Sequence, residues 1–425
     1  MQREPILLAS VINMGDKSGW MVVAGGVMVT LMLGVTYTWS VFAGPLAEKY
    51  GWSQTEVQLA YSIMLAAFSL SMIPAGILQD KRGPRDAVLL GGFLLGAGFV
   101  ATALFANSPL VLYVTYGLLA GAGVGFAYGA PLSAGVKWFP KNRGLVSGII
   151  MFGFGFSSLL LAPVAKEIIL SQGIGQAFLI LGIVITIVVG IGAMMLRNPS
   201  GFKPEGTAAD AAETGPMEMV GKREFWLLWA MFAFSASAGL MVIGNLATFA
   251  RLSFTAEHAM PADAAFSLAA LAVGILAVFN GGGRIFAGWA SDKIGRQKVI
   301  LALFGLQALL LSTILLASAV SPYLLLAWMA MIGFCFGSCF SLFPAATADF
   351  FGTRNMGVNY GVLFTAYGFG GILGPQAMAF MLDSAKASKG ALAVSDYATP
   401  FFLVGVLVGI AALLSFCLKA EKKGK

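Results

Sequence analysis

A single arginine stands inside an apolar stretch of the chain. The run 264–279 is apolar enough to lie in lipid, yet Arg284 follows it, and a further apolar turn comes before the next charge. An unpaired cation at this depth costs about 2.5–3.5 kcal/mol on insertion scales. A bound carboxylate would offset that cost through two parallel charge-assisted hydrogen bonds. We therefore predict that Arg284 serves the function of the protein; in the alternative interpretation its long side chain reaches the membrane surface.

Other polar side chains could complete such a site. Asn280 lies one helical turn before Arg284, where it could orient the guanidinium or hold neighbouring helices together. Tyr128 and Tyr367 fall near the middle of apolar runs, and this favours a pocket role because a buried phenol needs a partner. Tyr37 lies two residues before Trp39, so it suits either the pocket or the aromatic belt at the membrane surface.

The remaining reactive side chains predict no site of their own. Cys335 and Cys339 share one helix face, but no histidine or further cysteine accompanies them, so we predict no metal and no cofactor. His258, the single histidine, falls in a polar loop and is expected to be solvated. The sequence contains no catalytic triad or pair of carboxylates, so the protein is not expected to be an enzyme.

The elements that position these residues must be membrane spans. Of 425 residues, 58% are hydrophobic and 11% are charged, against roughly 25% charged residues in soluble domains. Apolar runs of about 20 residues, long enough to cross a bilayer as helices, recur along the whole chain. We predict an all-α membrane protein with twelve transmembrane helices. The expected spans are 20–42, 56–79, 87–106, 109–137, 145–170, 175–196, 224–250, 264–290, 299–320, 323–347, 356–382 and 397–418.

The positions of lysine and arginine predict the orientation of these spans. Most of the 26 fall on the side of the N-terminus, and the opposite loops hold few. Those few are Lys49, Lys166, Arg251, Lys386 and Lys389. Both termini are therefore expected to be cytoplasmic, in a multi-pass protein of the cell membrane, or of the inner membrane in a Gram-negative cell. The net charge of +7 follows from this topology and does not indicate nucleic-acid binding.

The chain also repeats itself, at an offset of 212 residues from Asp80 to Asp292. The pattern G-x-x-x-D-K-x-G occurs at both places, and its glycine permits a tight reversal between helices. Six helices are thus copied in the same orientation. The predicted domains are an N-terminal half, 1–196, a polar cytoplasmic linker, 197–223, and a C-terminal half, 224–425. Arg284 and Asn280 correspond to the apolar Met72 and Phe68, so the repeated scaffold does not require polar residues there.

The repeated pattern places carboxylates beside cations at helix ends. Such charges can pair across helices when this side of the molecule closes and separate when it opens. The predicted gating residues are Asp80, Lys81, Arg82, Arg85, Asp292, Lys293 and Arg296.

Three motifs resemble one branch of a transporter family. They are KWFPKNRGLVSG (137–148), NGGGR followed by GWASDKIGR (280–296), and NYGVLFTAYGFGG (359–371). Together they resemble the oxalate:formate antiporter branch of the major facilitator superfamily, which is related to the monocarboxylate transporters. The resemblance covers all twelve expected helices. It implies transport of small carboxylates by alternating access, with the arginine of helix 8, here Arg284, in contact with the substrate carboxylate.

The same resemblance assigns further pocket positions. Tyr37 and Tyr128 match pocket tyrosines, and Phe336 and Phe340 fall where the antiporter has larger or hydroxylated aromatic residues. We expect Phe336 and Phe340 mainly to pack between helices, with lining of the pocket as a secondary role. The antiporter carries a second cation, a lysine, on helix 11, where this chain has Tyr367. One cation suits a monocarboxylate better than oxalate.

We therefore expect a secondary transporter of small monocarboxylate anions such as formate, lactate or pyruvate, working as an exchanger or as a proton-coupled symporter. Its expected partners are the small carboxylate substrate and the lipid bilayer, with a functional monomer. Two alternatives stay open: an oxalate:formate-type exchanger of dicarboxylates, and a membrane receptor that has a transporter fold but does not transport.

Overall fold

The computed structural model describes residues 17–200 and 214–418, and both parts are helical. The chain ends and residues 201–213 of the predicted linker lie outside these ranges. The first half contains α1 (Lys17–Leu33), η1 (Gly34–Thr38), α2 (Trp39–Tyr50), α3 (Gln54–Arg82), α4 (Pro84–Phe105), α5 (Pro109–Leu112), η2 (Tyr113–Ala120), α6 (Gly121–Trp138), α7 (Arg143–Gln172) and α8 (Ile174–Met195).

The second half follows the short helix α9 (Pro216–Val220), which lies in the predicted linker and buries Met219. The helices of this half are α10 (Arg223–Ala256), α11 (Ala262–Ile294), α12 (Arg296–Ser312), α13 (Ile314–Val320), α14 (Pro322–Phe351), α15 (Met356–Lys389), η3 (Val394–Tyr397), α16 (Ala398–Leu414) and η4 (Ser415–Cys417).

Length and composition mark most of these helices as membrane spans. Within the described ranges, 10 helices or runs of helices could cross a membrane, and the pair α12 and α13, bent by 55°, makes up to 11. The remaining expected span, 356–382, lies in α15, whose 34 residues are long enough but include many glycines and several polar side chains. Every expected span therefore falls on helix, and the all-helical membrane architecture is confirmed.

Two glycines end equivalent helices at the repeated pattern. Gly83 follows α3 and Gly295 follows α11, with φ of 98° and 94°. This region of backbone space is open to glycine at little cost. A Cβ would meet nothing within 4 Å at either position, so the backbone conformation, not space, requires glycine. The next helix begins directly after each of them, which is the tight reversal that the sequence predicts.

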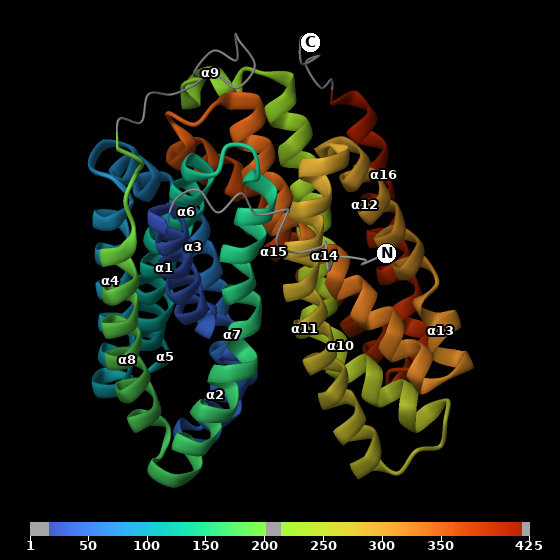
Figure 1. The fold of residues 1–425 in the computed structure, drawn as a ribbon. Helices are drawn as coiled ribbons and strands as arrows, with labels where there is room; N and C mark the ends of the chain where they lie inside the picture. Colours follow the sequence, from blue (N-terminus) through green and yellow to red (C-terminus); the bar gives the residue numbers. More distant parts are fainter. Residues whose placement is uncertain (1–16, 201–213, 419–425) are drawn as a thin grey trace, which may run out of the picture.

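The two halves meet along two seams with equivalent contacts. Figure 1 shows α1–α8 in one group and α10–α16 in the other. α3 packs against α15, and α7 packs against α11. A Cβ on Gly361 would collide with the backbone of Met72, and a Cβ on Gly148 would collide with the backbone of Arg284. Since Met72 and Arg284 are equivalent by the repeat, the two seams share one backbone arrangement and differ in the side chain that they bury.

Polar contacts join the halves at one end and in the middle. We call the end at which α9 lies the linker end (Figure 1), and the opposite end the far end. Asp80 and Asp292 reach across to the other half at the linker end. At the far end, no hydrogen bond joins the halves within the described helices. The structure is therefore held closed at the linker end.

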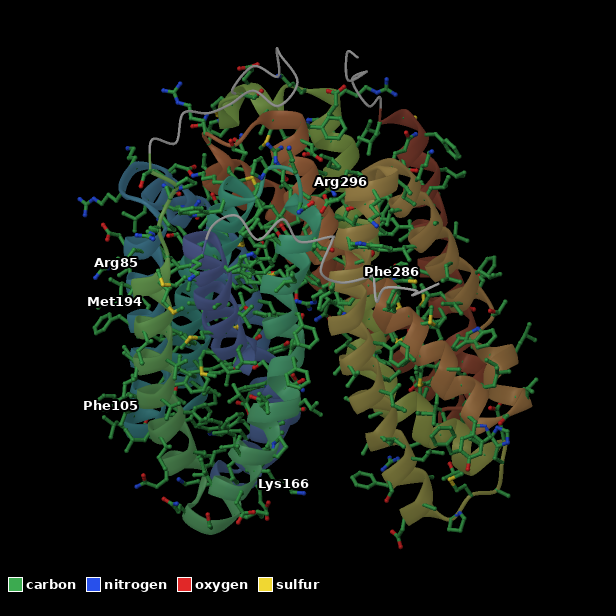
Figure 2. The ribbon with its side chains drawn as sticks, viewed as in Figure 1. Arg85, Phe105, Lys166, Met194, Phe286 and Arg296 are labelled. Carbon is green, nitrogen blue, oxygen red and sulfur yellow. The ribbon has the colours of Figure 1, made fainter. Side chains whose placement is uncertain are left out.

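Large apolar side chains cover the outside of the bundle. Phe105 and Phe286 point away from the helices, whereas Lys166 and Arg296 lie toward opposite ends (Figure 2). This distribution suits lipid around the middle and water at the two ends.

Irregular turns interrupt the first and fourth spans. η1 is a 3₁₀ turn that carries Tyr37, and η2 is a stretch of π-helix. Trp39, the first residue of α2 directly after η1, stacks on Tyr116 of η2 with ring centroids 4.3 Å apart. π-helical turns are rare and often occur at functional sites, so η2 is a feature of interest in the fourth span.

Candidate functional site

Arg284 lies in the seam between the halves and is 0% exposed. Its Nε and Nη2 donate hydrogen bonds to Asn280 Oδ1 over 3.2 and 2.7 Å. Its Nη1 donates to the carbonyl oxygen of Met151, in α7 of the other half, over 2.8 Å. The buried position excludes the alternative in which the side chain reaches the membrane surface.

Asn280 holds the guanidinium in this orientation. It lies one turn before Arg284 on α11, and its Nδ2 donates to the carbonyl oxygen of Gly333 in α14 over 3.2 Å. α14 can approach so closely because Gly337 has no side chain; a Cβ there would collide with the backbone of Asn280. Asn280 is thus fixed by the neighbouring helix and in turn directs Arg284 toward the first half.

The partners of Arg284 are all neutral. Amide and carbonyl oxygens accept its hydrogen bonds but do not cancel its charge, and no carboxylate in 17–200 or 214–418 forms an ion pair with it. An arginine has five N–H donors, so one N–H on each Nη has no partner in the described protein. A buried cation with free donors and no counter-ion is suited to bind an anion.

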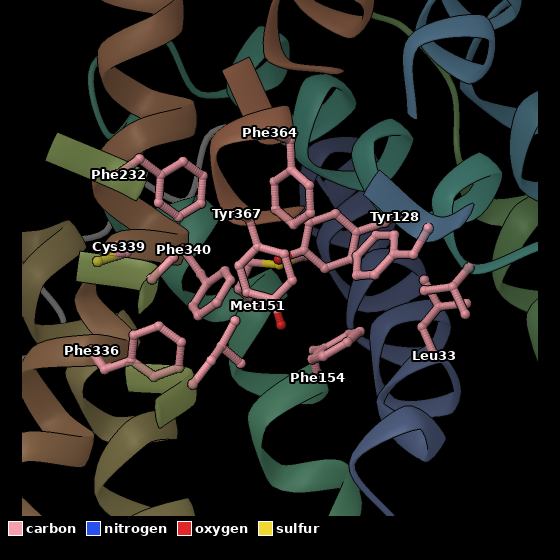
Figure 3. Close-up of a cluster of buried hydrophobic side chains, with 14 of the residues drawn as sticks. Leu33, Tyr128, Met151, Phe154, Phe232, Phe336, Cys339, Phe340, Phe364 and Tyr367 are labelled. Atoms are coloured by element: carbon pink, nitrogen blue, oxygen red, sulfur yellow. The ribbon is translucent and has the colours of Figure 1, made fainter. Parts of the chain in front are cut away.

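Aromatic rings lie around the guanidinium of Arg284, and Figure 3 shows this cluster of rings, with Phe340, Phe154, Phe336 and Tyr367 labelled. The ring centroids of Phe340 and Phe154 lie 4.3 and 5.8 Å from Arg284 Cζ, so both faces can stabilise the cation. Phe336 packs against Phe340 with centroids 5.3 Å apart, and Tyr367 does so at 5.7 Å. Phe340 and Phe154 therefore contact the cation, while Phe336 and Tyr367 form the next layer of rings.

Three tyrosine hydroxyl groups near this cluster are buried without a hydrogen-bond partner in the described protein: those of Tyr37, Tyr128 and Tyr360. The rings of Tyr37 and Tyr128 meet Phe154 nearly edge-on, with centroids 5.0 and 5.3 Å apart. Leaving a buried donor unpaired costs about 1–3 kcal/mol. Hydroxyl groups of this kind are available to a bound ligand.

Sequence reasoning missed Tyr360. It belongs to the NYG motif that opens α15, and it lies two helical turns before Tyr367. Its position near a helix end, among glycines, gave no reason to separate it from interface tyrosines. The usable signal was its spacing of seven, which puts Tyr360 and Tyr367 on one helix face.

The single histidine is packed, not solvated as expected. His258 is half-buried, and its Nε2 lies 2.7 Å from the carbonyl oxygen of Ser318. No group of three or more His, Cys, Asp or Glu side chains in the described ranges is placed to hold a metal ion.

The two repeated aspartates cap helices of the opposite half. Asp80 accepts hydrogen bonds from the backbone N–H groups of Gly357 and Val358, at the start of α15, over 3.1 and 2.9 Å. Asp292 likewise accepts from Gly144 and Leu145, at the start of α7, over 3.0 and 2.8 Å. A carboxylate at a helix N-terminus satisfies free N–H groups and favours the helix dipole. These two equivalent pairs of hydrogen bonds both join the halves at the linker end.

A charge network reinforces this closure. Arg296 binds Asp292 over 2.5 Å and Asp349 over 2.9 Å, both within the second half. Asp349 also binds Arg143 of the first half over 2.9 Å. The gating set from the sequence did not include Arg143 or Asp349, because nothing in the local pattern of either shows that they meet.

The other predicted gating cations lie apart from the network. Lys81, Arg82 and Arg85 are exposed and form no ion pair with any described residue. Arg85 instead contacts the sulfur of Met194 in its own half, and the two are neighbours in Figure 2. Lys293 lies over the ring of Trp289 at 4.4 Å. A gating role for these four cations stays a prediction.

Repeated helical halves, a buried cation between them and a charged closure at one end together define a secondary transporter of small solutes. A family model for the Major Facilitator Superfamily matches residues 24–375. The chain belongs to the major facilitator superfamily; it is a multi-pass membrane transporter and not an enzyme.

Relatives place the chain near carboxylate transporters. The oxalate:formate antiporter of Oxalobacter formigenes is 32% identical over 367 residues, covering 85% of each chain. Monocarboxylate transporter 11 of Homo sapiens is 28% identical over 402 residues, covering 92% of this chain and 80% of that one. The solved structure of the proton:xylose symporter XylE covers 96% of this chain and 97% of its own, with a TM-score of 0.68 at 16% identity, and shows the fold alone. The resemblance drawn from the three motifs is confirmed.

Proposed function

We propose that this transporter carries small monocarboxylate anions, of the size of formate, lactate or pyruvate, by alternating access. The observation that carries the proposal is Arg284: a buried cation, fixed by neutral groups, with two free N–H donors and no carboxylate paired with it in the described protein. A carboxylate accepts two parallel hydrogen bonds from a guanidinium and cancels its charge. The proposed binding residues are Arg284 and Asn280, with Tyr37, Tyr128, Tyr367, Phe336 and Phe340 around them.

The proposed orientation puts the linker end in the cytoplasm, with both termini. This orientation follows from the distribution of lysine and arginine in the sequence. The chain ends themselves lie outside the described residues. In this orientation the structure is closed toward the cytoplasm by Asp80, Asp292 and the Arg143–Asp349 ion pair. Release of these contacts would open the site to the cytoplasm, and the functional unit is the monomer.

Exchange of oxalate is the second candidate, favoured by the 32% identity to the oxalate:formate antiporter. The side chains around Arg284 argue against it. Tyr367 occupies the position at which the resemblance expects a second cation, and its ring is packed among Phe340, Phe364 and Phe232. Two negative charges would therefore meet one positive charge in a buried site, which is costly.

Uptake by purified protein in proteoliposomes tests the proposal. Labelled formate, lactate, pyruvate and oxalate are offered with and without a pH gradient, and with unlabelled acid inside. We expect saturable uptake of at least one monocarboxylate, stimulated by internal acid, with oxalate the weaker substrate. Preferred uptake of oxalate would favour the second candidate, and binding without counterflow would indicate a receptor.

A further inference from the structure

Tyr360 is a buried tyrosine at the linker-end side of the site. Its side chain is 1% exposed, and its ring packs on Phe364 with centroids 5.7 Å apart. Phe364 in turn packs on Tyr128 at 5.0 Å, so the two tyrosines share one ring as a neighbour. Tyr360 is also within electrostatic range of both Tyr128 and Arg284.

The hydroxyl groups of Tyr128 and Tyr360 are not satisfied by hydrogen bonds in the empty site. Both are buried and lie near each other, but neither makes a hydrogen bond of normal geometry with a described residue. Burial of an unpaired hydroxyl group is unfavourable, so each such group needs a specific explanation, of which a bound ligand is one. Two such groups beside one buried cation therefore indicate a shared ligand.

The donors around Arg284 match the acceptors of one carboxylate. An ionised carboxylate has about four lone-pair sites. Arg284 offers one free N–H on each Nη, because its other three N–H groups bind Asn280 and Met151. The O–H groups of Tyr128 and Tyr360 supply two more donors. Arg284 would then supply the charge, and the two phenols would complete the hydrogen bonds.

We propose that Tyr360 is a further substrate-binding residue, which donates a hydrogen bond, together with Tyr128, to the carboxylate held by Arg284. This inference rests on the proposed function.

The variant Tyr360→Phe tests the role because it removes one oxygen and keeps the ring. We expect the half-saturating concentration of the acid to rise about ten-fold in proteoliposome uptake, which corresponds to the loss of one hydrogen bond to a charged group. The melting temperature without added anion should be unchanged or higher, since the lost hydroxyl has no partner to lose. Tyr397→Phe is the matched control: Tyr397 is also buried, but it packs on Phe249 and Phe401 away from the site, so this variant should transport as the native protein does.

Two results would overturn the inference. One is an unchanged half-saturating concentration in Tyr360→Phe; the other is a lower melting temperature without anion, because a hydroxyl that supports the fold is not a free ligand. The probes are labelled formate, lactate and pyruvate. If the native protein takes up oxalate instead, the proposed substrate class fails, and the comparison is made with labelled oxalate, which presents the same carboxylate group. If the native protein takes up none of the four acids, both the function and the role of Tyr360 are wrong.

Discussion

At the scale of single residues, the function depends on how the charge of Arg284 is balanced. Asn280 and Met151 bind three N–H groups of the guanidinium without adding negative charge. Asn280 is the more informative partner, because an aspartate of nearly the same shape at this position would form an internal ion pair. The choice of an amide keeps Arg284 in place and leaves its charge for the substrate.

Asn280→Asp should therefore weaken substrate binding. Its carboxylate would lie where Asn280 Oδ1 now accepts hydrogen bonds from Arg284 over 2.7 and 3.2 Å, and a neutral site attracts an anion less. We expect the half-saturating concentration for monocarboxylate uptake to rise about ten-fold or more, a change of ~1.4 kcal/mol or more. Uptake measured over a range of concentrations checks this, and an unchanged or lower value would show that Asn280 does not tune the charge of the site.

Tyr367→Lys should shift the preference toward oxalate. Tyr367 lies one ring beyond Phe340, so a lysine there would bring a second cation toward the site. Charge matching then favours two carboxylates, by about a factor of ten in relative affinity, or ~1.4 kcal/mol. Competition of unlabelled oxalate against labelled lactate measures this, with Tyr367→Met as the uncharged control. Equal inhibition of the native protein and Tyr367→Lys by oxalate would mean that this position does not set charge selectivity.

At the scale of helices, each half caps a helix of the other. Asp80 caps the start of α15, and Asp292 caps the start of α7. Gly361 of α15 and Gly148 of α7 have no side chain, so these helices approach the opposite half backbone to backbone. The two caps are equivalent by the internal repeat, so closure of the linker end is a property of the duplicated scaffold. The ion pair between Arg143 and Asp349 adds a further contact between the halves.

Neutral variants of the two aspartates should loosen this end. Asp80→Asn and Asp292→Asn keep an acceptor but remove the charge at the helix N-terminus, which is worth about 1–2 kcal/mol in a partly buried setting. Exchange of the backbone amides at the starts of α15 and α7 should become about 5–30-fold faster. Hydrogen exchange measured by mass spectrometry tests this.

The pattern of hydrogen exchange shows whether the two caps open together as a gate or each affects only its own helix. If the caps open together, each variant raises exchange at both helix starts, and this is the result that we expect. Asp86→Asn, at an exposed acid in the first turn of α4, should change neither. A rise confined to the helix that lost its own cap would contradict concerted opening.

Features that repeat along the chain or within one helix could be predicted from the sequence. The spans follow from apolar length, the turn glycines from the repeated pattern, and the site arginine from its isolation. The Arg143–Asp349 ion pair and the role of Asp80 as a cap could not, because these contacts join segments more than 200 residues apart in opposite halves. His258 was misjudged because its partner, Ser318, belongs to another helix, 60 residues further along the chain. Tyr360 was missed because an unpaired hydroxyl is visible only once its neighbours are known.

At the scale of the whole molecule, the balance of charge predicts the mode of transport. Empty, the buried site carries the positive charge of Arg284; loaded with a monoanion, it is neutral. The loaded form should change between its open states more easily, because a buried unpaired charge is costly. The closure of the linker end in the structure is one of the two states that this cycle requires.

Exchange should therefore be faster than net flux. Proteoliposomes preloaded with unlabelled lactate should take up labelled lactate several times faster than empty ones, measured as initial rates at one pH. If a pH gradient drives net accumulation as fast as internal lactate drives exchange, the carrier has a proton-binding group that balances Arg284, and the argument from charge does not hold.

The central claim, that Arg284 binds the substrate carboxylate, is tested most directly by counterflow in proteoliposomes containing native protein, Arg284→Lys or Arg284→Ala. The account predicts that Arg284→Ala inserts and melts as a folded protein but shows no counterflow of labelled formate, lactate or pyruvate. Arg284→Lys should retain only a small fraction of the native rate, because an ammonium cannot form two parallel hydrogen bonds with a carboxylate. Counterflow near the native rate by a folded Arg284→Ala protein would contradict the account.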